Sequence, residues 1–289
     1  MSKVALVLIY NHHYPQNIDT LNNYYSKQFS NIYHLVPFYK GSKKNVIPVY
    51  ENSFYFQGYI SQGLKHFYTE DYNDYIFAAD DLLLNPEFNE NNYAKKLSLS
   101  DNACFISELI GLNEGKLGWM RLKEAVAYKI QKPGIEVQTL IPSFRETALK
   151  FNSFGFGVGL IKAEYVLREK MTEKDKNVMY ATRYPLLGGH SDFFVVSKQT
   201  IREFSHFCGV FAATDLFVEL AVPTAMVLTA NKIITETALT YKIREKWSQE
   251  QYDMLAKQCE NRVSKLLNNF PDNFLYIHPV KFSKWINDL

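Results

Sequence analysis

The stretch that decides the fold spans residues 75–86 and reads Tyr75-Ile76-Phe77-Ala78-Ala79-Asp80-Asp81-Leu82-Leu83-Leu84-Asn85-Pro86. Its first five residues are apolar and include aromatic and β-branched side chains, so we expect a buried strand over residues 75–79. Two carboxylates follow this strand directly and repel each other where hydration is poor. Asp80 and Asp81 therefore predict either a divalent-cation site, since Mg²⁺ and Mn²⁺ prefer oxygen ligands, or the acidic first turn of a helix.

The first eighty residues alternate between strand-like and helix-like segments. Short apolar runs predict strands, and apolar residues repeated every three or four positions predict helices. Such alternation is typical of an α/β fold, in which parallel strands place ligands at their carboxyl ends. The expected strands are residues 4–10, 32–38, 46–50 and 75–79, and the expected helices are residues 18–29 and 56–68.

The rest of the chain is less regular. Residues 109–150 combine glycine, proline and charged residues around one helix-like segment, 121–130, and predict loops and insertions. Residues 182–197 are strand-like, and residues 200–207 predict a helix. Apolar spacing over residues 249–268 predicts one long amphipathic helix near the C-terminus.

Composition excludes several classes of protein. Of 289 residues, 32 are Lys or Arg and 30 are Asp or Glu, and the net charge of +2 lacks the basic excess of nucleic-acid-binding proteins. No segment approaches the roughly 20 apolar residues of a membrane-spanning helix, which leaves peripheral membrane association open. The three cysteines are widely spaced and the N-terminal apolar run predicts a strand, so we expect reduced thiols in a cytoplasmic protein.

Residues 75–86 resemble the strand and carboxylate motif of nucleotide-sugar-dependent glycosyltransferases of the GT-A fold, such as those of bacterial polysaccharide biosynthesis. In that family a hydrophobic strand ends in an Asp-x-Asp element. The resemblance implies an α/β protein with a Rossmann-related mixed central sheet flanked by helices. It also implies one domain over residues 1–289, with a nucleotide-binding half (1–100) and an acceptor-binding half (101–289) that ends in a helix and a tail.

The family motif implies a role for each aspartate by its position. Asp81 matches the final aspartate, which binds the Mn²⁺ or Mg²⁺ ion that bridges the donor diphosphate. Asp80 matches the middle position, beside the donor. Ala79 stands where the first aspartate of a complete motif would lie, so only one of the two usual carboxylates is in register.

Two earlier segments correspond to nucleotide contacts in the family. The end of the first strand implies donor contacts from Tyr10 and Asn11, and the start of the helix at residues 56–68 implies one from Gln57. His12 and His13 follow Asn11, and solvated loop residues are the alternative interpretation for both.

A glycine pair precedes the strand expected near residue 193. Gly188 and Gly189 allow the backbone to approach a ligand closely and leave N–H groups to bind oxygens, although an ordinary turn is the alternative. The segment resembles the sugar-binding region of GT-A enzymes, which implies donor contacts from both glycines. Asp192 would then bind a sugar hydroxyl or act as the general base.

A second candidate base lies further along the chain. Asp215 and Glu219 are spaced to share one helix face in apolar surroundings. In inverting GT-A enzymes an acidic residue at a helix start deprotonates the acceptor, and Glu219 matches that position; a capped and solvated helix face is the alternative. The sequence does not decide between Asp192 and Glu219.

Near the C-terminus, His278 and Lys281 resemble the His…Lys element of several GT-A enzymes. In those enzymes the histidine completes the metal site and the lysine neutralises diphosphate oxygens. Imidazole and ammonium groups suit a metal ion and a phosphate respectively. A purely structural His-Pro pair is the alternative.

The resemblance implies a glycosyltransferase that moves a sugar from a nucleotide-diphosphate donor, above all a UDP-sugar, to a hydroxyl of a saccharide or glycolipid acceptor in surface glycan biosynthesis. The alternative is a sugar- or nucleotide-binding module without turnover. The chain contains 20 Tyr and 21 Phe, and we expect some of these rings to stack on the base or the sugar. The rings expected to do so are Tyr10, Phe56, Phe193 and Phe194.

Overall fold

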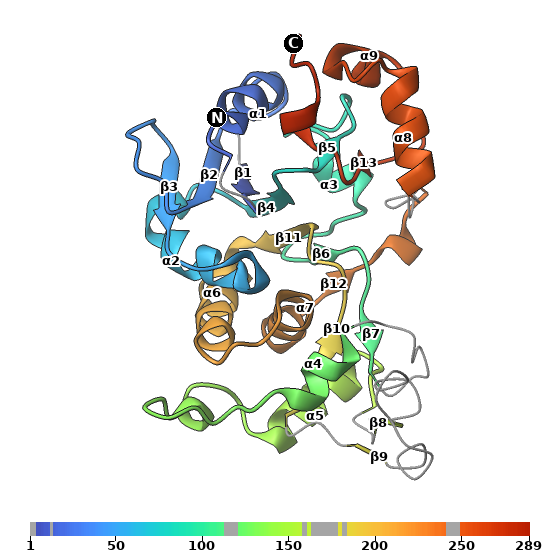
Figure 1. Ribbon diagram of the computed structural model, residues 1–289. Helices are drawn as coiled ribbons and strands as arrows, with labels where there is room; N and C mark the ends of the chain where they lie inside the picture. The colour runs from blue at the N-terminus through green and yellow to red at the C-terminus, as the bar shows by residue number, and fades with distance from the viewer. Residues whose placement is uncertain are drawn as a thin grey trace, which may run out of the picture.

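A central sheet with helices on both faces organises the chain (Figure 1). The computed structural model describes residues 4–11, 14–112, 121–157, 161–162, 179–180, 184–240 and 249–289. The strands of the central sheet are β1 (Val4–Ile9), β2 (Ile32–Pro37), β3 (Val46–Val49), β4 (Asp74–Ala79), β6 (Cys104–Ile106), β11 (Phe193–Ser197) and β12 (Ile233–Ile234). Their spatial order is β3-β2-β1-β4-β11-β6-β12, and β11 runs antiparallel to both of its neighbours while the other pairs are parallel.

Helices and short hairpins complete the described part of the chain. Three two-stranded pairs lie outside the central sheet: β5 (Leu83–Leu84) with β13 (Tyr276–Ile277), β7 (Ile110–Gly111) with β10 (Leu187–Gly188), and β8 (Ile161–Lys162) with β9 (Met179–Tyr180). The helices are α1 (Asn17–Tyr25), α2 (Gln57–Phe67), α3 (Tyr93–Lys96), α4 (Leu122–Ala127), α5 (Phe144–Ser153), α6 (Lys198–Ala213), α7 (Val218–Thr229), α8 (Gln249–Gln258) and α9 (Val263–Asn268).

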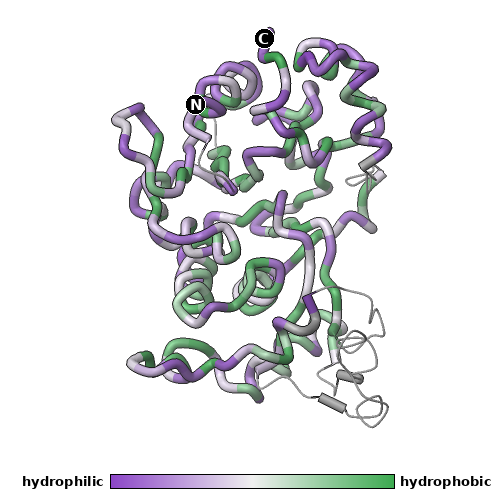
Figure 2. The backbone as a smooth tube through the Cα atoms, in the orientation of Figure 1, coloured by the Kyte–Doolittle hydropathy of each residue, from purple (hydrophilic) through white to green (hydrophobic). Residues whose placement is uncertain are grey.

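Strand β1 explains why both faces of the sheet are covered. All six of its residues are buried, and successive side chains of a strand point to opposite faces. Ala5, Val7 and Ile9 pack with α2, α6 and α7, whereas the alternate residues pack with α1, β5 and the C-terminal segment. Figure 2 shows that α7 is mostly hydrophobic, whereas hydrophilic residues dominate the outer helix α8.

The expected α/β class is confirmed, and the strands and helices expected in the first eighty residues are present with small differences at their ends. The single helix expected over residues 249–268 is wrong. Glu260 and Asn261 adopt left-handed backbone conformations, with φ of 52° and 50°, and separate α8 from α9. The Asn261 N–H donates to the carbonyl of Ala256 and closes the end of α8.

None of the helices in the described part of the chain is both long enough and apolar enough to cross a bilayer.

A buried hydrogen bond joins Tyr10, directly after β1, to His34 within β2. Tyr10 is fully buried, and its hydroxyl lies 3.0 Å from Nδ1 of His34. Burial lowers the pKa of His34 to about 4. His34 is therefore neutral near pH 7, and its Nδ1 shares a hydrogen bond with the Tyr10 hydroxyl.

The buried imidazole predicts an acid-sensitive fold. Because the pKa of His34 falls from 6.5 to about 4 on folding, the unfolded chain binds a proton at higher pH than the folded chain does. This stabilisation is complete above pH 6.5, the pKa of His34 in the unfolded chain. It is lost as the pH falls towards about 4, the pKa of His34 in the folded chain. Over that window it amounts to about 3 kcal/mol, at roughly 1.4 kcal/mol per pKa unit. We expect His34→Gln to flatten this decline in urea unfolding, whereas the exposed control His66→Gln keeps it; equal slopes for both variants would contradict the assignment.

Candidate functional site

Strand direction brings four acidic residues to one edge of the central sheet. Asp80 and Asp81 follow β4, and Glu108 follows β6, which runs in the same direction. Asp192 precedes β11, which runs the opposite way, so it begins at the edge where β4 ends. The Ala79 N–H donates to the carbonyl of Asp192 at 2.8 Å and ties these two strand ends together.

A second backbone pairing adds a histidine from the C-terminal segment. Strand β5 begins just after Asp81 and pairs with β13, and the Val280 N–H donates to the carbonyl of Asp81 at 2.6 Å. His278 lies between these two contacts. Its Nε2 is 3.3 Å from Oδ1 of Asp81 and 3.8 Å from Oδ1 of Asp192. The structure thus brings together three of the residues that the sequence singled out.

A second set of polar and charged side chains lies around Glu219, at the start of α7. Its carbonyl accepts a hydrogen bond from the Gly189 N–H at 3.0 Å, which fixes α7 beside the glycine pair. Its carboxylate lies 3.6 Å from Nδ1 of His190 and 3.9 Å from Nε of Arg121. Nε2 of His190 in turn lies 2.7 Å from Oε1 of Glu108. His190 therefore bridges two carboxylates.

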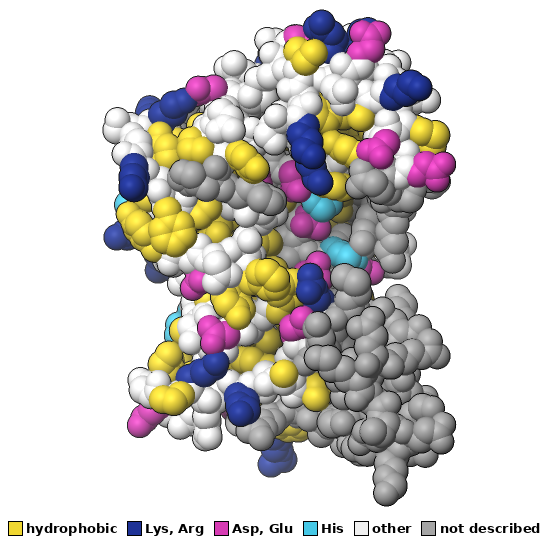
Figure 3. Space-filling view, in the orientation of Figure 1, with side chains coloured by type: hydrophobic (Ala, Val, Ile, Leu, Met, Phe, Trp, Pro, Cys, Tyr) yellow, Lys and Arg dark blue, Asp and Glu magenta, His cyan; other side chains and the backbone are white. Residues whose placement is uncertain are grey.

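Asp192 lies between the Asp81–His278 pair and the side chains around Glu219, and its pKa responds to both. Burial raises its pKa, His278 and His190 lower it, and the carboxylates of Asp81 and Glu219 raise it. Its side chain retains 26% exposure, so it lies deep among protein atoms yet still reaches solvent. Figure 3 shows acidic and histidine side chains gathered at the narrow middle of the molecule, with Lys or Arg side chains above and below them.

The two adjacent aspartates have different surroundings. Asp80 is only 2% exposed, and its Oδ1 accepts the N–H of Asn11 at 2.9 Å. Burial and the neighbouring Asp81 raise the pKa of Asp80 to about 7. Asp80 therefore holds the chain after β1 in place, and Asp81 is the aspartate that faces His278.

The donor chemistry of Asp81 and His278 fits a divalent cation. Oδ1 of Asp81 is buried and makes no hydrogen bond within the described residues; its contact is the His278 imidazole. A carboxylate and an imidazole together suit Mn²⁺ better than Mg²⁺, which favours oxygen ligands throughout. Across the described ranges, no group of three or more His, Cys, Asp or Glu side chains is arranged as a complete ligand set. The donor atoms of Asp81 and His278 therefore suit a divalent cation, but these two residues do not form a complete set of ligands.

Two expected donor contacts lie in the interior. Tyr10 is buried against His34, as described above. Gln57 is also fully buried, and its Nε2 donates to the carbonyl of Leu216 at 2.8 Å. Both side chains join elements of the core and do not line the edge.

Two other expected donor contacts are not in the interior. Asn11 lies at the edge through its contact with Asp80, and Lys281 is exposed directly after Val280. The donor roles of Asn11 and Lys281 remain predictions. His12 and His13 lie outside the described residues.

The expected stacking of four aromatic rings on a ligand is wrong. Tyr10, Phe56, Phe193 and Phe194 are each no more than 4% exposed, so no ligand can reach their faces without unfolding the core. Phe194 instead stacks on Phe77 with ring centroids 4.9 Å apart.

Two details of the later segments also need correction. The Gly189 N–H is not free for a ligand, because it bonds to Glu219. Asp215 and Glu219 do not share a helix face, since α7 begins at Val218 and Asp215 has a left-handed φ of 59°. Asp215 pairs instead with Lys132 at 2.6 Å.

Sequence reasoning missed Glu108 and Arg121. Glu108 carried a usable signal, because it is an acidic residue just past a short apolar segment, like Asp80 after β4. Arg121 carried none, since only the folded chain brings it to Glu219.

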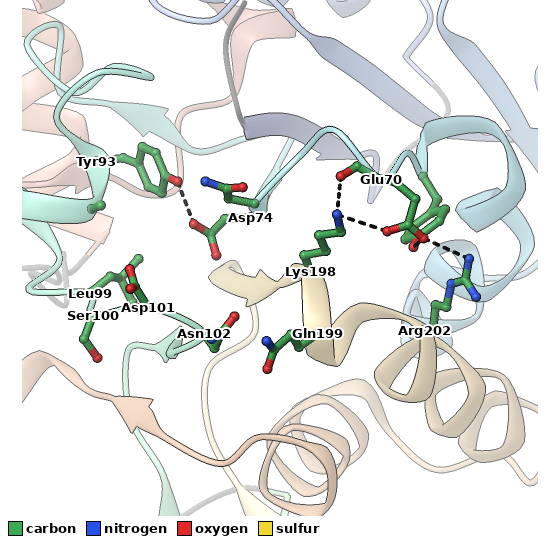
Figure 4. A pocket seen from close by; sticks show the side chains of 13 residues that line it. Glu70, Asp74, Tyr93, Leu99, Ser100, Asp101, Asn102, Lys198, Gln199 and Arg202 are labelled. Atoms are coloured by element: carbon green, nitrogen blue, oxygen red, sulfur yellow. Dashed lines mark hydrogen bonds and ion pairs between the residues drawn. The ribbon is translucent and has the colours of Figure 1, made fainter.

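A separate pocket of about 770 Å³ opens at the opposite edge, near the start of β4 (Figure 4). Four of its charged side chains have partners within the pocket. Lys198 and Arg202 point to Glu70, at 3.0 Å and 3.2 Å, and the Tyr93 hydroxyl donates to Asp74 at 2.6 Å. The candidate site is assigned to the carboxyl edge, where the buried Oδ1 of Asp81 makes no hydrogen bond within the described residues.

No protein-family model matches the chain, and no curated protein matches it in sequence. The candidate site therefore rests on the geometry of Asp81, Asp192, His278 and Glu219.

Gly189 tests how tightly this edge is packed. A Cβ at this position would lie 2.4 Å from the carbonyl oxygen of Glu108. We expect Gly189→Ala to lower the free energy of unfolding by about 1–3 kcal/mol in urea titrations, the usual cost of overpacking. Lys284→Ala, at an exposed position, is the control and should change the free energy of unfolding by no more than about 0.5 kcal/mol. Equal stability of the Gly189→Ala variant and the parent would contradict the close packing.

Proposed function

We propose that this protein is a glycosyltransferase of the GT-A type that moves a sugar from a nucleotide-diphosphate donor, with a UDP-sugar favoured, to a hydroxyl acceptor. One observation carries the proposal. Asp81, Asp192 and His278 come from three distant parts of the chain and meet at the carboxyl edge of the sheet, with contacts of 3.3 Å and 3.8 Å. That edge is where parallel α/β sheets bind ligands.

Asp81 and His278 would hold the donor side of the reaction. A divalent cation bound there, Mn²⁺ or Mg²⁺, would neutralise the departing diphosphate. Lys281 is exposed beside this pair and would add a further positive charge near the phosphates. Asn11 would contact the nucleotide from the loop that Asp80 holds, and Gly188 would let the backbone approach the sugar.

Asp192 would serve as the general base for the acceptor hydroxyl. Its raised pKa favours proton uptake, and its partial exposure leaves it accessible to an acceptor hydroxyl. Glu219 is already close to the Arg121 guanidinium and to the His190 imidazole, whereas the His278 imidazole lies 3.8 Å from Asp192. Glu219 would accordingly bind and orient the acceptor.

A binding module without turnover is the second candidate. The observation in its favour is Ala79, which leaves one carboxylate fewer at the strand end than a complete motif would have. Nucleotide or saccharide binding without bond cleavage would identify such a module.

The decisive experiment is a donor screen that measures nucleotide release from UDP-, GDP- and CMP-sugars with and without Mn²⁺. We expect metal-dependent release from one donor class and a loss of about 100-fold or more in Asp81→Asn, because a preorganised charge at the leaving group is removed. Asp272→Asn makes the same chemical change at an exposed position and should retain full release.

Unchanged release in Asp81→Asn would remove the metal-assisted mechanism. Calorimetry with UDP and GDP separates the remaining cases. Saccharide binding without any nucleotide affinity would favour the binding module over the enzyme.

The choice of base is tested by comparing two isosteric variants. Asp192→Asn should lower kcat for transfer by about 10²–10⁴-fold, the usual contribution of a general base. Glu219→Gln should mainly raise the acceptor KM, because it weakens contacts made in the ground state. The reverse pattern in steady-state kinetics would assign the base to Glu219.

A further inference from the structure

An exposed aromatic ring lies beside the candidate site. Phe54 is 55% exposed, although full burial of such a ring would be favourable. A single exposed ring is common on protein surfaces, so the residues around Phe54 decide whether it belongs to a binding surface. One of these residues is Phe217, which is 8% exposed and lies two residues before Glu219.

The local structure holds the Phe54 ring in place. Phe54 lies in a short 3₁₀ helix, Ser53–Tyr55, whose N-terminus is capped when Oδ1 of Asn52 accepts the Phe54 N–H at 3.0 Å. The ring meets Phe217 edge to face, with centroids 5.5 Å apart and planes inclined at 64°. The exposed ring is therefore preorganised.

Arg121 links the Phe54–Phe217 pair to the carboxylates of Glu219 and Glu124. Its guanidinium carbon lies 4.3 Å from the centroid of Phe217 and 6.0 Å from that of Phe54. Its Nε is 3.9 Å from Glu219, and its Nη1 is 3.6 Å from Glu124. A continuous surface thus runs from an apolar ring to a hydrogen-bonding carboxylate, and we call Phe54, Phe217, Arg121 and Glu219 the aromatic shelf.

The chemistry of the aromatic shelf selects a class of ligand. A flat ring can pack against the C–H face of a sugar, while carboxylate, imidazole and guanidinium groups bind its hydroxyls. Around Arg121 the carboxylates of Glu124 and Glu219 already offset its charge, and Glu108 lies beyond His190. Acidic sugars and phosphorylated acceptors would meet these carboxylates and be repelled.

We propose that the aromatic shelf is a binding site for a neutral saccharide, with Phe54 as its stacking ring and Glu219 as its hydroxyl partner. The identification of this saccharide as the acceptor rests on the proposed glycosyltransferase function. Its binding to the shelf does not.

Saccharide binding to the full chain, without any donor, is the direct test. Calorimetry with maltotriose, cellotriose and chitotriose should detect at least one neutral ligand, and sialyllactose should bind more weakly. Phe54→Ala should weaken binding roughly three- to tenfold, as expected for the loss of one aromatic contact. Phe54→Trp should restore it, and a merely structural role for Phe54 would not produce that rescue.

The control removes an exposed ring elsewhere. Phe144→Ala, at the start of α5, where the ring is 49% exposed, should bind like the parent. If donor turnover is found, Phe54→Ala should raise the acceptor KM by the same factor as it weakens binding.

The outcomes separate this inference from the proposed function. Phe54-dependent saccharide binding without any donor turnover supports the shelf and contradicts the glycosyltransferase. Donor turnover with an acceptor KM and saccharide binding that Phe54→Ala leaves unaltered overturns the shelf. Failure of all three neutral saccharides to bind, or preferential binding of sialyllactose, also overturns it.

Discussion

The hydrogen bond from the Ala79 N–H to the carbonyl of Asp192 is the contact on which the site depends. It continues the antiparallel ladder in which Phe193 pairs with Ala78, and so it sets the register of β11 against β4. A slip of one residue would reverse the face of every β11 side chain and bury Asp192 on the wrong side. The chemistry at the edge is thus fixed by backbone pairing between two hydrophobic strands.

Hydrophobic burial has an electrostatic consequence at the same edge. Strands β4 and β11 are almost entirely buried, so the carboxylates at their ends lie where hydration is poor. Three of the acidic residues there have different partners: Asp80 has backbone and amide donors, Glu219 has Arg121 and His190, and within the described residues the Asp81 carboxylate has the His278 imidazole. This uneven compensation singles out Asp81 as the position where an added positive charge would be most favourable.

The sequence predicted what depends on local patterns. The place of Asp81 at a strand end was predictable because an apolar run precedes Asp80 and Asp81, whereas His278 was singled out by the resemblance of residues 278–281 to a family motif. The burial of Tyr10 and Gln57 was not predictable, because their polar atoms are satisfied by His34 and by the carbonyl of Leu216, both distant in sequence. Arg121 was missed for the same reason, since its contacts exist only in the folded chain.

The positions of the strand ends also explain how one edge of the sheet holds two separate sets of polar and charged side chains. The Asp81–His278 pair is held by β5 and β13, whereas Glu219 is held by Gly189 and α7, so the two groups are supported by different elements. Asp192 is the residue between them whose pKa responds to both. A negative ligand beside Asp81 would raise the pKa of Asp192, and a cation there would lower it. Charge placed beside either set of side chains would therefore change the pKa of Asp192.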